Sequence, residues 1–241
     1  NTSAVRVTEK VGRERVRALA RDFGITSPIA AGPAIALGAS EVTLLEITGA
    51  YAGILNGGVR AKPYGIREVR LRADGSRVMG GDREKPVRVI SEHSAGMLTW
   101  MMTQVIENGT GRRARLDDRP AAGKTGTTSA ARDASFVGFT GDYVAGVWMG
   151  YDDNTPLTGV TGGGLPAEIW RETMIRVHEG LPPRELPLVV PQPFSGQEGL
   201  VASNETGQPA PPDSAPSTVE SVDAAVRSVV DSLVRSIFGT N

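Results

Sequence analysis

Apolar side chains recur at helical spacing in four parts of the first 180 residues, and we expect a helix in each. The expected helices span residues 4–23 with a break near Gly12, Ser40 to Asn56, Ser91 to about Glu107, and Pro166 to about Glu179. Serine is a favoured N-cap residue, so we expect Ser40 to cap the second helix. Most of these apolar stripes are expected to form core.

Short runs of apolar and β-branched residues predict strands in two further regions. Residues 66–78 contain the turn pair Asp74-Gly75 and are typical of a hairpin. Residues 122–129, 135–140 and 144–151 are three runs separated by polar turns, which favours an antiparallel meander. Helices around an antiparallel sheet predict an α+β domain over residues 1–180.

The composition changes after Gly180, because nine of the sixteen prolines lie between Pro182 and Pro216. Residues 181–216 are therefore expected to be an extended, poorly packed linker. In residues 217–239, a capping-box pattern and a stripe of valines predict an amphipathic helix. This helix is expected either to dock on its own domain or to bind a protein partner.

The charge and composition exclude several classes of protein. The chain has 26 basic and 27 acidic residues, but residues 1–120 carry a charge of +6 and residues 121–241 a charge of −7. Opposite charges on the two halves favour two lobes that attract each other. Nucleic-acid binding would need one concentrated basic face, so we expect no nucleic-acid partner. The absence of cysteine excludes disulfides and thiolate chemistry, and no apolar run is long enough to span a bilayer. The first residue is Asn1, so we expect a processed or partial piece of something longer.

The segment with the most specific chemistry is Ala121 to Thr128, which contains Lys124-Thr125-Gly126. A phosphate-binding loop would need a glycine at position 118, where Asp118 would repel a phosphate instead. The alternative is the Lys-Thr-Gly element of serine enzymes that process penicillin and D-Ala-D-Ala peptides. There a cation and hydroxyls on an edge strand can hold a carboxylate while a peptide adds as a further strand. A solvated edge strand without function is the remaining interpretation.

Several other segments resemble the transpeptidase domain of bifunctional, class A penicillin-binding proteins. They are Asn1-Thr2-x-Ala4-Val5, residues 40–58, Gly109 to Ala114, Arg132 to Gly138, and Val147 to Asp153. The resemblance covers about residues 1–180. It implies part of the serine penicillin-recognising fold, in which helices cover a five-stranded antiparallel sheet and a helical lobe carries the elements missing here.

The resemblance also implies roles for individual residues. Lys124 and Thr127 would be catalytic, with the Thr127 N–H stabilising the oxyanion, and Asn1 would be the last residue of the Ser-x-Asn element. Thr125, Gly126, Thr127 and Thr128 would bind the substrate. No cofactor and no metal are implied, and Asp152-Asp153-Asn154 is more typical of a turn than of a metal site.

In one respect the chain departs from the family, since no Ser-x-x-Lys element occurs in its 241 residues. The nucleophilic serine and its lysine are therefore not in this sequence, and we expect this polypeptide alone to be inactive. The missing N-terminal part of the domain would be a partner.

The expected function of the whole enzyme is peptidoglycan D,D-transpeptidation, with stem peptides as substrates and β-lactams as ligands. The resemblance places it at the outer face of a bacterial inner membrane, anchored by an N-terminal helix that this chain lacks. The alternatives are a D,D-carboxypeptidase or β-lactamase relative, and a non-catalytic module that binds the cell wall or a partner.

Overall fold

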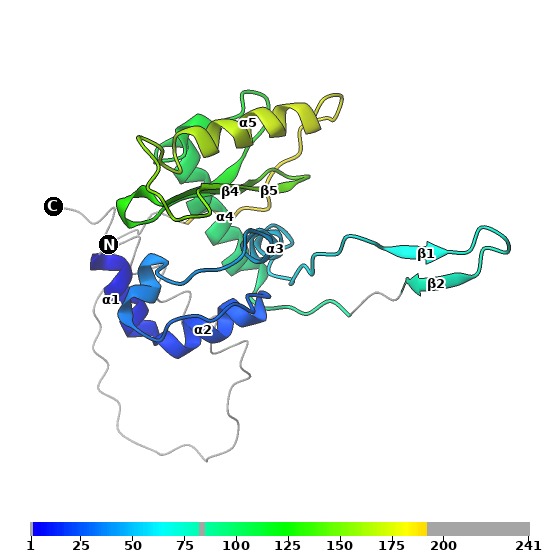
Figure 1. Ribbon diagram of the computed structural model, residues 1–241, viewed down its shortest axis with the longest axis horizontal. Coiled ribbons are helices and arrows are strands. Elements are labelled where there is room, and N and C mark those ends of the chain that lie inside the picture. Colours follow the sequence, from blue (N-terminus) through cyan, green and yellow to red (C-terminus); the bar gives the residue numbers. More distant parts are fainter. Residues whose placement is uncertain (1, 82–84, 192–241) are drawn as a thin grey trace, which may run out of the picture.

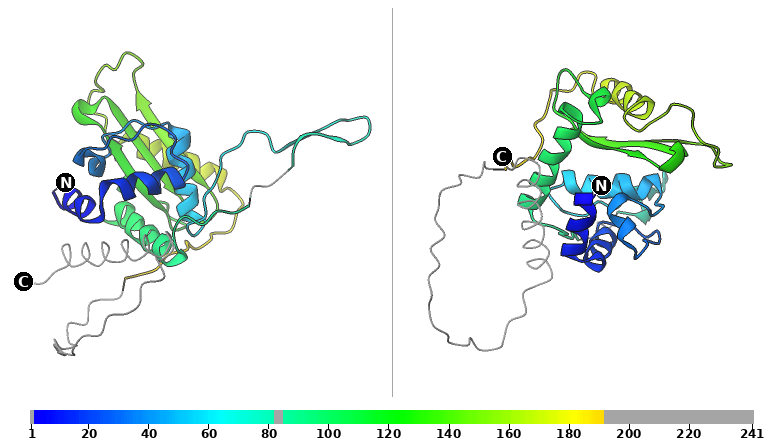
Figure 2. Two further views of the ribbon diagram at one scale, coloured as in Figure 1. Left: turned by 90° about the horizontal axis from the view of Figure 1, so that it is seen from below. Right: turned by 90° about the vertical axis from the view of Figure 1, so that its left-hand side faces the viewer.

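The computed structural model describes residues 2–81 and 85–191, and Figures 1 and 2 show their arrangement. The five α-helices of this part are α1 (Thr2–Val11), α2 (Arg13–Asp22), α3 (Leu44–Leu55), α4 (Glu92–Glu107) and α5 (Leu165–Val177). The strands are β1 (Glu68–Arg70), β2 (Arg77–Gly80), β3 (Ala122–Thr127), β4 (Asp133–Phe139) and β5 (Val144–Gly150). Short 3-10 turns are η1 (Pro33–Leu37), η2 (Arg112–Ala114) and η3 (Ser129–Ala131).

The central sheet has the order β3-β4-β5, and both strand pairs are antiparallel. Helix α5 covers one face of this sheet, whereas α3 and α4 cover the other (Figure 1; Figure 2, right). This layering is an α+β architecture, as the sequence predicts. The resemblance implies five strands in one sheet, but the described residues form three, because the β1–β2 hairpin pairs only with itself and projects from the body (Figure 1).

Trp170 of α5 is the centre of the core on one face of the sheet. Its side chain is completely buried and meets the Phe136 ring edge-on, with centroids 5.2 Å apart. The Trp170 indole N–H lies within hydrogen-bond distance of two strand carbonyls, Gly138 O at 3.3 Å and Ala145 O at 3.1 Å. The ring and its polar hydrogen therefore fix α5 on both β4 and β5.

A second core lies on the opposite face, between the sheet and helices α3 and α4. Met102 of α4 packs there with Ala122 of β3 and Phe139 of β4, and Tyr51 of α3 borders this cluster. Burial raises the pKa of Tyr51 to about 12. Helix α4 thus packs against the first residues of β3, whereas Lys124 and Thr127 further along the strand are exposed.

The predicted helix boundaries are confirmed in two places and wrong in one. The break near Gly12 is confirmed, with a φ of 98° that suits glycine, and Ser91 caps α4 by accepting from the Ser94 N–H at 3.1 Å. The expectation that Ser40 caps α3 is wrong. Thr43 is the cap, in a reciprocal capping box with Glu46, while Ser40 Oγ accepts from the Ala30 N–H at 2.9 Å.

Glu46 also ties the preceding loop to α3. Its carboxylate accepts hydrogen bonds from the side chains and backbone N–H groups of Thr26 and Ser27, in addition to those of Thr43. The Ser27 and Thr26 hydroxyls are the main reason that the pKa of Glu46 is lowered far below its usual range.

The chain after α5 is extended but not poorly packed in its first part. Leu186 is buried, the Val189 N–H donates to Gly96 O at 3.0 Å, and Arg119 donates to Leu181 O at 3.0 Å. These contacts anchor residues 181–191 to the body, although most of their side chains are exposed. The rest of the predicted linker and the predicted helix 217–239 lie outside the described residues. None of the described helices is long and apolar enough to cross a membrane.

Candidate active site

The Lys-Thr-Gly segment lies on β3, which is an edge strand of the three-stranded sheet. The Thr128 N–H donates to the Asp133 carbonyl of β4 at 3.0 Å. Because successive N–H groups along a strand point to opposite sides, the Thr127 and Thr125 N–H groups point to the open edge. That edge is where a peptide could add as a further strand.

The side chains of this segment alternate between the two faces of the sheet. Lys124 pairs with Val137 and faces the side of α3 and α4, whereas Thr125 pairs with Phe136 and faces the side of α5. Lys124 is exposed, and its Nζ donates to the Thr125 carbonyl at 3.0 Å. Since that carbonyl points to the open edge, the ammonium group lies there as well.

Thr125 contacts a threonine from a different segment. Its Oγ1 lies 2.7 Å from Thr110 Oγ1. Thr110 follows the end of α4, where the Gly111 N–H donates to Val105 O at 2.8 Å. The segment after α4 is thereby folded back against the face of β3 that carries Thr125.

Thr127 is held by the loop before α5. Its Oγ1 accepts a hydrogen bond from the Gly162 N–H at 3.0 Å. Gly162 lies so close to the strands that a Cβ built on it would be 2.4 Å from both Gly126 O and Ser135 O. Only glycine permits this approach, and the contact fixes the loop over β3 and β4.

Thr128 and the turn after it have a structural role. Thr128 Oγ1 accepts from the Asp133 N–H at 2.8 Å, which closes the connection between β3 and β4. Within this connection Ala130 and Ala131 have φ angles of 61° and 51°, a region that costs an L-residue about 1 kcal/mol or more. The Leu157 N–H donates to Ala131 O at 2.8 Å and helps to hold this conformation.

Of the other residues that the sequence singles out, Asn1 lies outside the described residues. Asp153 Oδ1 accepts from the Thr155 N–H at 3.0 Å, which is a turn contact. The Thr155 side chain, followed by this N–H, lowers the pKa of Asp153. No group of three or more His, Asp or Glu side chains that could hold a metal occurs in residues 2–81 and 85–191.

His178 is buried at the end of α5 and links that helix to the turn between β4 and β5. Its Nδ1 lies 2.6 Å from Met174 O, and a carbonyl can only accept, so Nδ1 carries the hydrogen. In the neutral imidazole Nε2 then accepts from the Thr140 hydroxyl, whose oxygen lies 2.9 Å away. This arrangement gives His178 a structural role.

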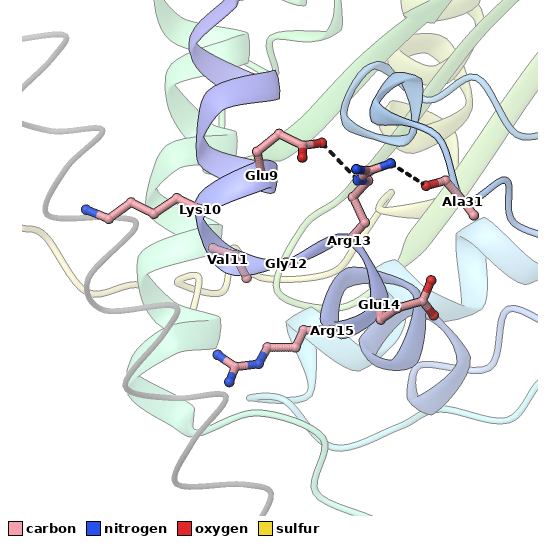
Figure 3. Close-up of a pocket in the computed structure, with 8 residues that line it drawn as sticks. All are labelled: Glu9, Lys10, Val11, Gly12, Arg13, Glu14, Arg15 and Ala31. Carbon is pink, nitrogen blue, oxygen red and sulfur yellow. Dashed lines mark hydrogen bonds and ion pairs between the residues drawn. The ribbon is translucent and has the colours of Figure 1, made fainter.

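A hollow at the break between α1 and α2 is shown in Figure 3. Its lining is Glu9, Lys10, Val11, Gly12, Arg13, Glu14, Arg15 and Ala31. Arg13 spans it by pairing with Glu9 and donating to Ala31 O (Figure 3). None of these lining residues carries a hydroxyl or thiol, so the hollow does not supply the serine-type nucleophile that the sequence predicts.

Thr110 and Gly162 are the two contact residues that sequence reasoning missed. Thr110 lies within the Gly109 to Ala114 segment, to which the resemblance attached no role. Gly162 begins the Gly162-Gly163-Gly164 run, which the sequence predicts as a mobile loop before the last helix and which the resemblance places near the binding cleft, where it would gate the cleft. Neither pattern indicates that these residues bind the hydroxyls of β3.

Comparisons with known proteins identify the family to which these features belong. Residues 1–174 match the model of the penicillin binding protein transpeptidase domain. Penicillin-binding protein 1A of Aquifex aeolicus (strain VF5) is 35% identical over 175 residues, which cover 72% of this chain and 24% of that protein. Penicillin-binding protein 2D of Bacillus subtilis (strain 168) is 33% identical over 215 residues, which cover 86% of this chain and 30% of that protein.

Solved structures show the same likeness. PonA1 from Mycobacterium tuberculosis in complex with penicillin V matches with a TM-score of 0.63 at 25% identity, covering 76% of this chain and 56% of that one. Penicillin-binding protein 1A from Haemophilus influenzae matches with a TM-score of 0.66 at 27% identity, covering 76% and 33%. The chain spans about a quarter to a third of the length of the two curated relatives.

Proposed function

Because the chain belongs to the family of class A penicillin-binding protein transpeptidase domains, we propose that its β3 edge binds the D-Ala-D-Ala end of a peptidoglycan stem peptide. The observation that carries this proposal is the exposed Lys124 beside the open backbone edge of Thr125 and Thr127. A cation, two hydroxyls and strand N–H groups that point to the open edge meet there.

These groups match the chemistry of an acyl donor that ends in a carboxylate. The Lys124 ammonium attracts the terminal carboxylate, and the hydroxyls of Thr125 and Thr127 donate to it. The Thr127 N–H, which points to the open edge, donates to the oxyanion that forms at the scissile carbonyl. Gly126, between the two threonines, would contribute backbone to this site, and its lack of a side chain leaves room for Ser135, whose Oγ would lie 2.4 Å from an added Cβ.

The proposed reaction is an acyl transfer in two steps. A serine hydroxyl attacks the carbonyl of the penultimate D-Ala, an ester forms, and the terminal D-Ala leaves with a proton on its amine. The amine of a neighbouring stem peptide then attacks the ester, an amide forms, and the serine regains its hydrogen. No Ser-x-x-Lys occurs in the 241 residues, so we propose that the serine comes from outside this sequence and that these residues alone do not form the ester.

The same site would take β-lactams, because their carboxylate and strained amide mimic the peptide terminus. This proposal is supported by the likeness to PonA1, whose structure contains penicillin V. Stem peptides and the remaining part of the domain are the proposed partners. Cross-linking of peptidoglycan would place the site on the outer side of the cytoplasmic membrane, with an N-terminal helix as anchor.

A fluorescent penicillin tests this proposal on the complete protein that carries the Ser-x-x-Lys element. The label is expected to remain attached after denaturation, and Lys124→Ala is expected to slow labelling by roughly 10-fold to 100-fold, because charge-assisted hydrogen bonds contribute about 1.5–3 kcal/mol. Lys124→Arg is the matched control that keeps the cation. Equal labelling rates for Lys124→Ala and wild type would contradict the proposed role of Lys124.

Two further assays test the finer parts of the proposal. We expect the isolated 241-residue chain not to form an acyl-enzyme. Fluorescent penicillin that stayed attached to this chain after denaturation would disprove that expectation. An added acceptor amine is expected to divert the acyl group into a cross-linked product, whereas a D,D-carboxypeptidase or β-lactamase would pass it to water.

A further inference from the structure

We propose that Thr110 is a positioning residue of this site, which donates its hydroxyl hydrogen to Thr125 Oγ1 and so makes the Thr125 hydroxyl a donor to the substrate carboxylate. The inference rests on the proposed function and adds a residue and a selectivity to it. The observation behind it is the distance of 2.7 Å between the two hydroxyl oxygens.

The direction of this hydrogen bond decides what Thr125 can do. A threonine hydroxyl has one hydrogen and two lone pairs. If Thr125 donated to Thr110, only lone pairs of Thr125 would be left to face the carboxylate, and the two would repel each other. When Thr110 is the donor, the Thr125 hydrogen is free to point at the anion. A bound carboxylate therefore selects the state in which Thr110 donates.

The hydroxyl of Thr127 is in a similar position, but there the direction of the hydrogen bond is fixed. Thr127 Oγ1 accepts from the Gly162 backbone N–H, which can only donate. The hydrogen of Thr127 is thus also left for a ligand. The two threonines share one face of β3 at a spacing of roughly 6.6 Å along the strand, so one carboxylate between them can accept from both at about 2.7 Å per bond.

Thr110 is well placed for this role because its backbone is held on two sides. The next residue, Gly111, is bonded to Val105 at the end of α4. On the other side the loop before α5 passes so closely that a Cβ on Gly163 would lie 2.1 Å from Thr110 O. The ion pair of Arg113 with Glu168 joins the same segment to α5. The Thr110 hydroxyl oxygen is therefore in place before any ligand arrives, and only the hydrogen has to turn, which keeps the entropic cost of binding low.

This arrangement predicts selectivity for an anion. Two donors and a cation favour a free carboxylate, whereas a neutral ester in the same position accepts more weakly and gains little from Lys124. The loss of Thr110 should therefore weaken the reaction of carboxylate ligands much more than the reaction of their esters. A role of Thr110 in folding alone would affect both kinds of ligand equally.

The test uses the complete protein with its Ser-x-x-Lys element and two probes, a fluorescent penicillin and its carboxylate methyl ester. The variants are Thr110→Val, which keeps the shape but removes the hydroxyl, and Thr110→Ser, which keeps the hydroxyl. We expect the second-order acylation constant of Thr110→Val to fall roughly 10-fold to 100-fold for the acid and less than about 2-fold for the ester, compared with wild type. Thr110→Ser should stay within about 3-fold of wild type for both probes.

Three outcomes would overturn this inference. Unchanged acylation of Thr110→Val by the acid would show that Thr125 does not depend on Thr110. Equal losses with acid and ester, accompanied by a lower melting temperature, would assign Thr110 a structural role only. Failure of the wild-type protein to react with the acid would instead disprove the proposed function on which the inference depends.

Discussion

Replacement of Gly162 by alanine is expected to loosen the loop that holds Thr127. The added Cβ would lie 2.4 Å from the carbonyl oxygens of Gly126 and Ser135, and 2.8 Å from Gly126 N. Contacts between carbon and a carbonyl oxygen are normally about 3.3–3.6 Å, so the loop has to withdraw by about 1 Å. All three contacts are to strand backbone, which cannot rotate out of the way as a side chain could.

Both stability and activity should respond to this withdrawal. The Gly162 N–H to Thr127 Oγ1 distance would grow from 3.0 Å to about 4 Å, which breaks the hydrogen bond. We expect the free energy of unfolding to fall by about 2–4 kcal/mol, from about 1–3 kcal/mol of overpacking and about 1 kcal/mol for the lost bond. Acylation by the penicillin acid should slow by roughly 10-fold, because the Thr127 hydrogen is no longer directed to the carboxylate.

Thermal denaturation and the acylation assay on the complete protein check this expectation. Gly32→Ala is a matched control, since a Cβ on Gly32 meets nothing within 4 Å and its φ of −76° suits alanine. That variant should melt and react like wild type. If Gly162→Ala were indistinguishable from Gly32→Ala in both measurements, the close approach of Gly162 would hold neither the loop nor Thr127.

Three further changes test other parts of the fold. Trp170→Phe removes the hydrogen that bonds two strand carbonyls, and we expect chemical denaturation to show a loss of about 2 kcal/mol in stability. Ala130→Gly should raise stability by about 1 kcal/mol in thermal unfolding, because glycine adopts the φ of 61° without strain. Glu46 has a lowered pKa, so its contribution is complete above the ordinary carboxyl pKa of about 4.3 and is lost as the pH falls toward the folded-state value. The melting temperature of Glu46→Gln should therefore be lower than that of wild type at pH 7, and the difference should shrink below about pH 4.

Local signals in the sequence were sufficient where a feature depends only on near neighbours. The break at Gly12 follows from a glycine within a helical pattern, and the start of α4 follows from a serine that caps the N–H three residues later. The error at Ser40 has a local cause as well. The Thr43-x-x-Glu46 pattern is the stronger cap signal, because two hydrogen bonds form at once, and Ser40 instead serves a backbone N–H ten residues earlier in the chain.

Contacts between distant segments could not be predicted in this way. The Lys-Thr-Gly motif indicates an edge strand near a carboxylate, but nothing in its neighbourhood shows that Thr110, 15 residues earlier, reaches Thr125. Gly162 lies 35 residues after Thr127, and its contact exists only once α5 is packed on the sheet. For the same reason the prolines after Gly180 predict an extended chain correctly, yet they do not reveal that Leu186 fills a place in the core.

The alternation of side chains along β3 limits where a substrate can lie. Lys124 leaves the strand on one face, whereas Thr125 and Thr127 leave it on the other, so a ligand on either face would meet only part of the site. The Lys124 ammonium returns to the open edge through its bond to Thr125 O, and the Thr127 N–H points to the same edge. A stem peptide can meet all of these groups only if it lies along that edge as a further strand. The serine of the proposed reaction would then approach β3 from the side opposite to β4, where the Lys124 ammonium lies.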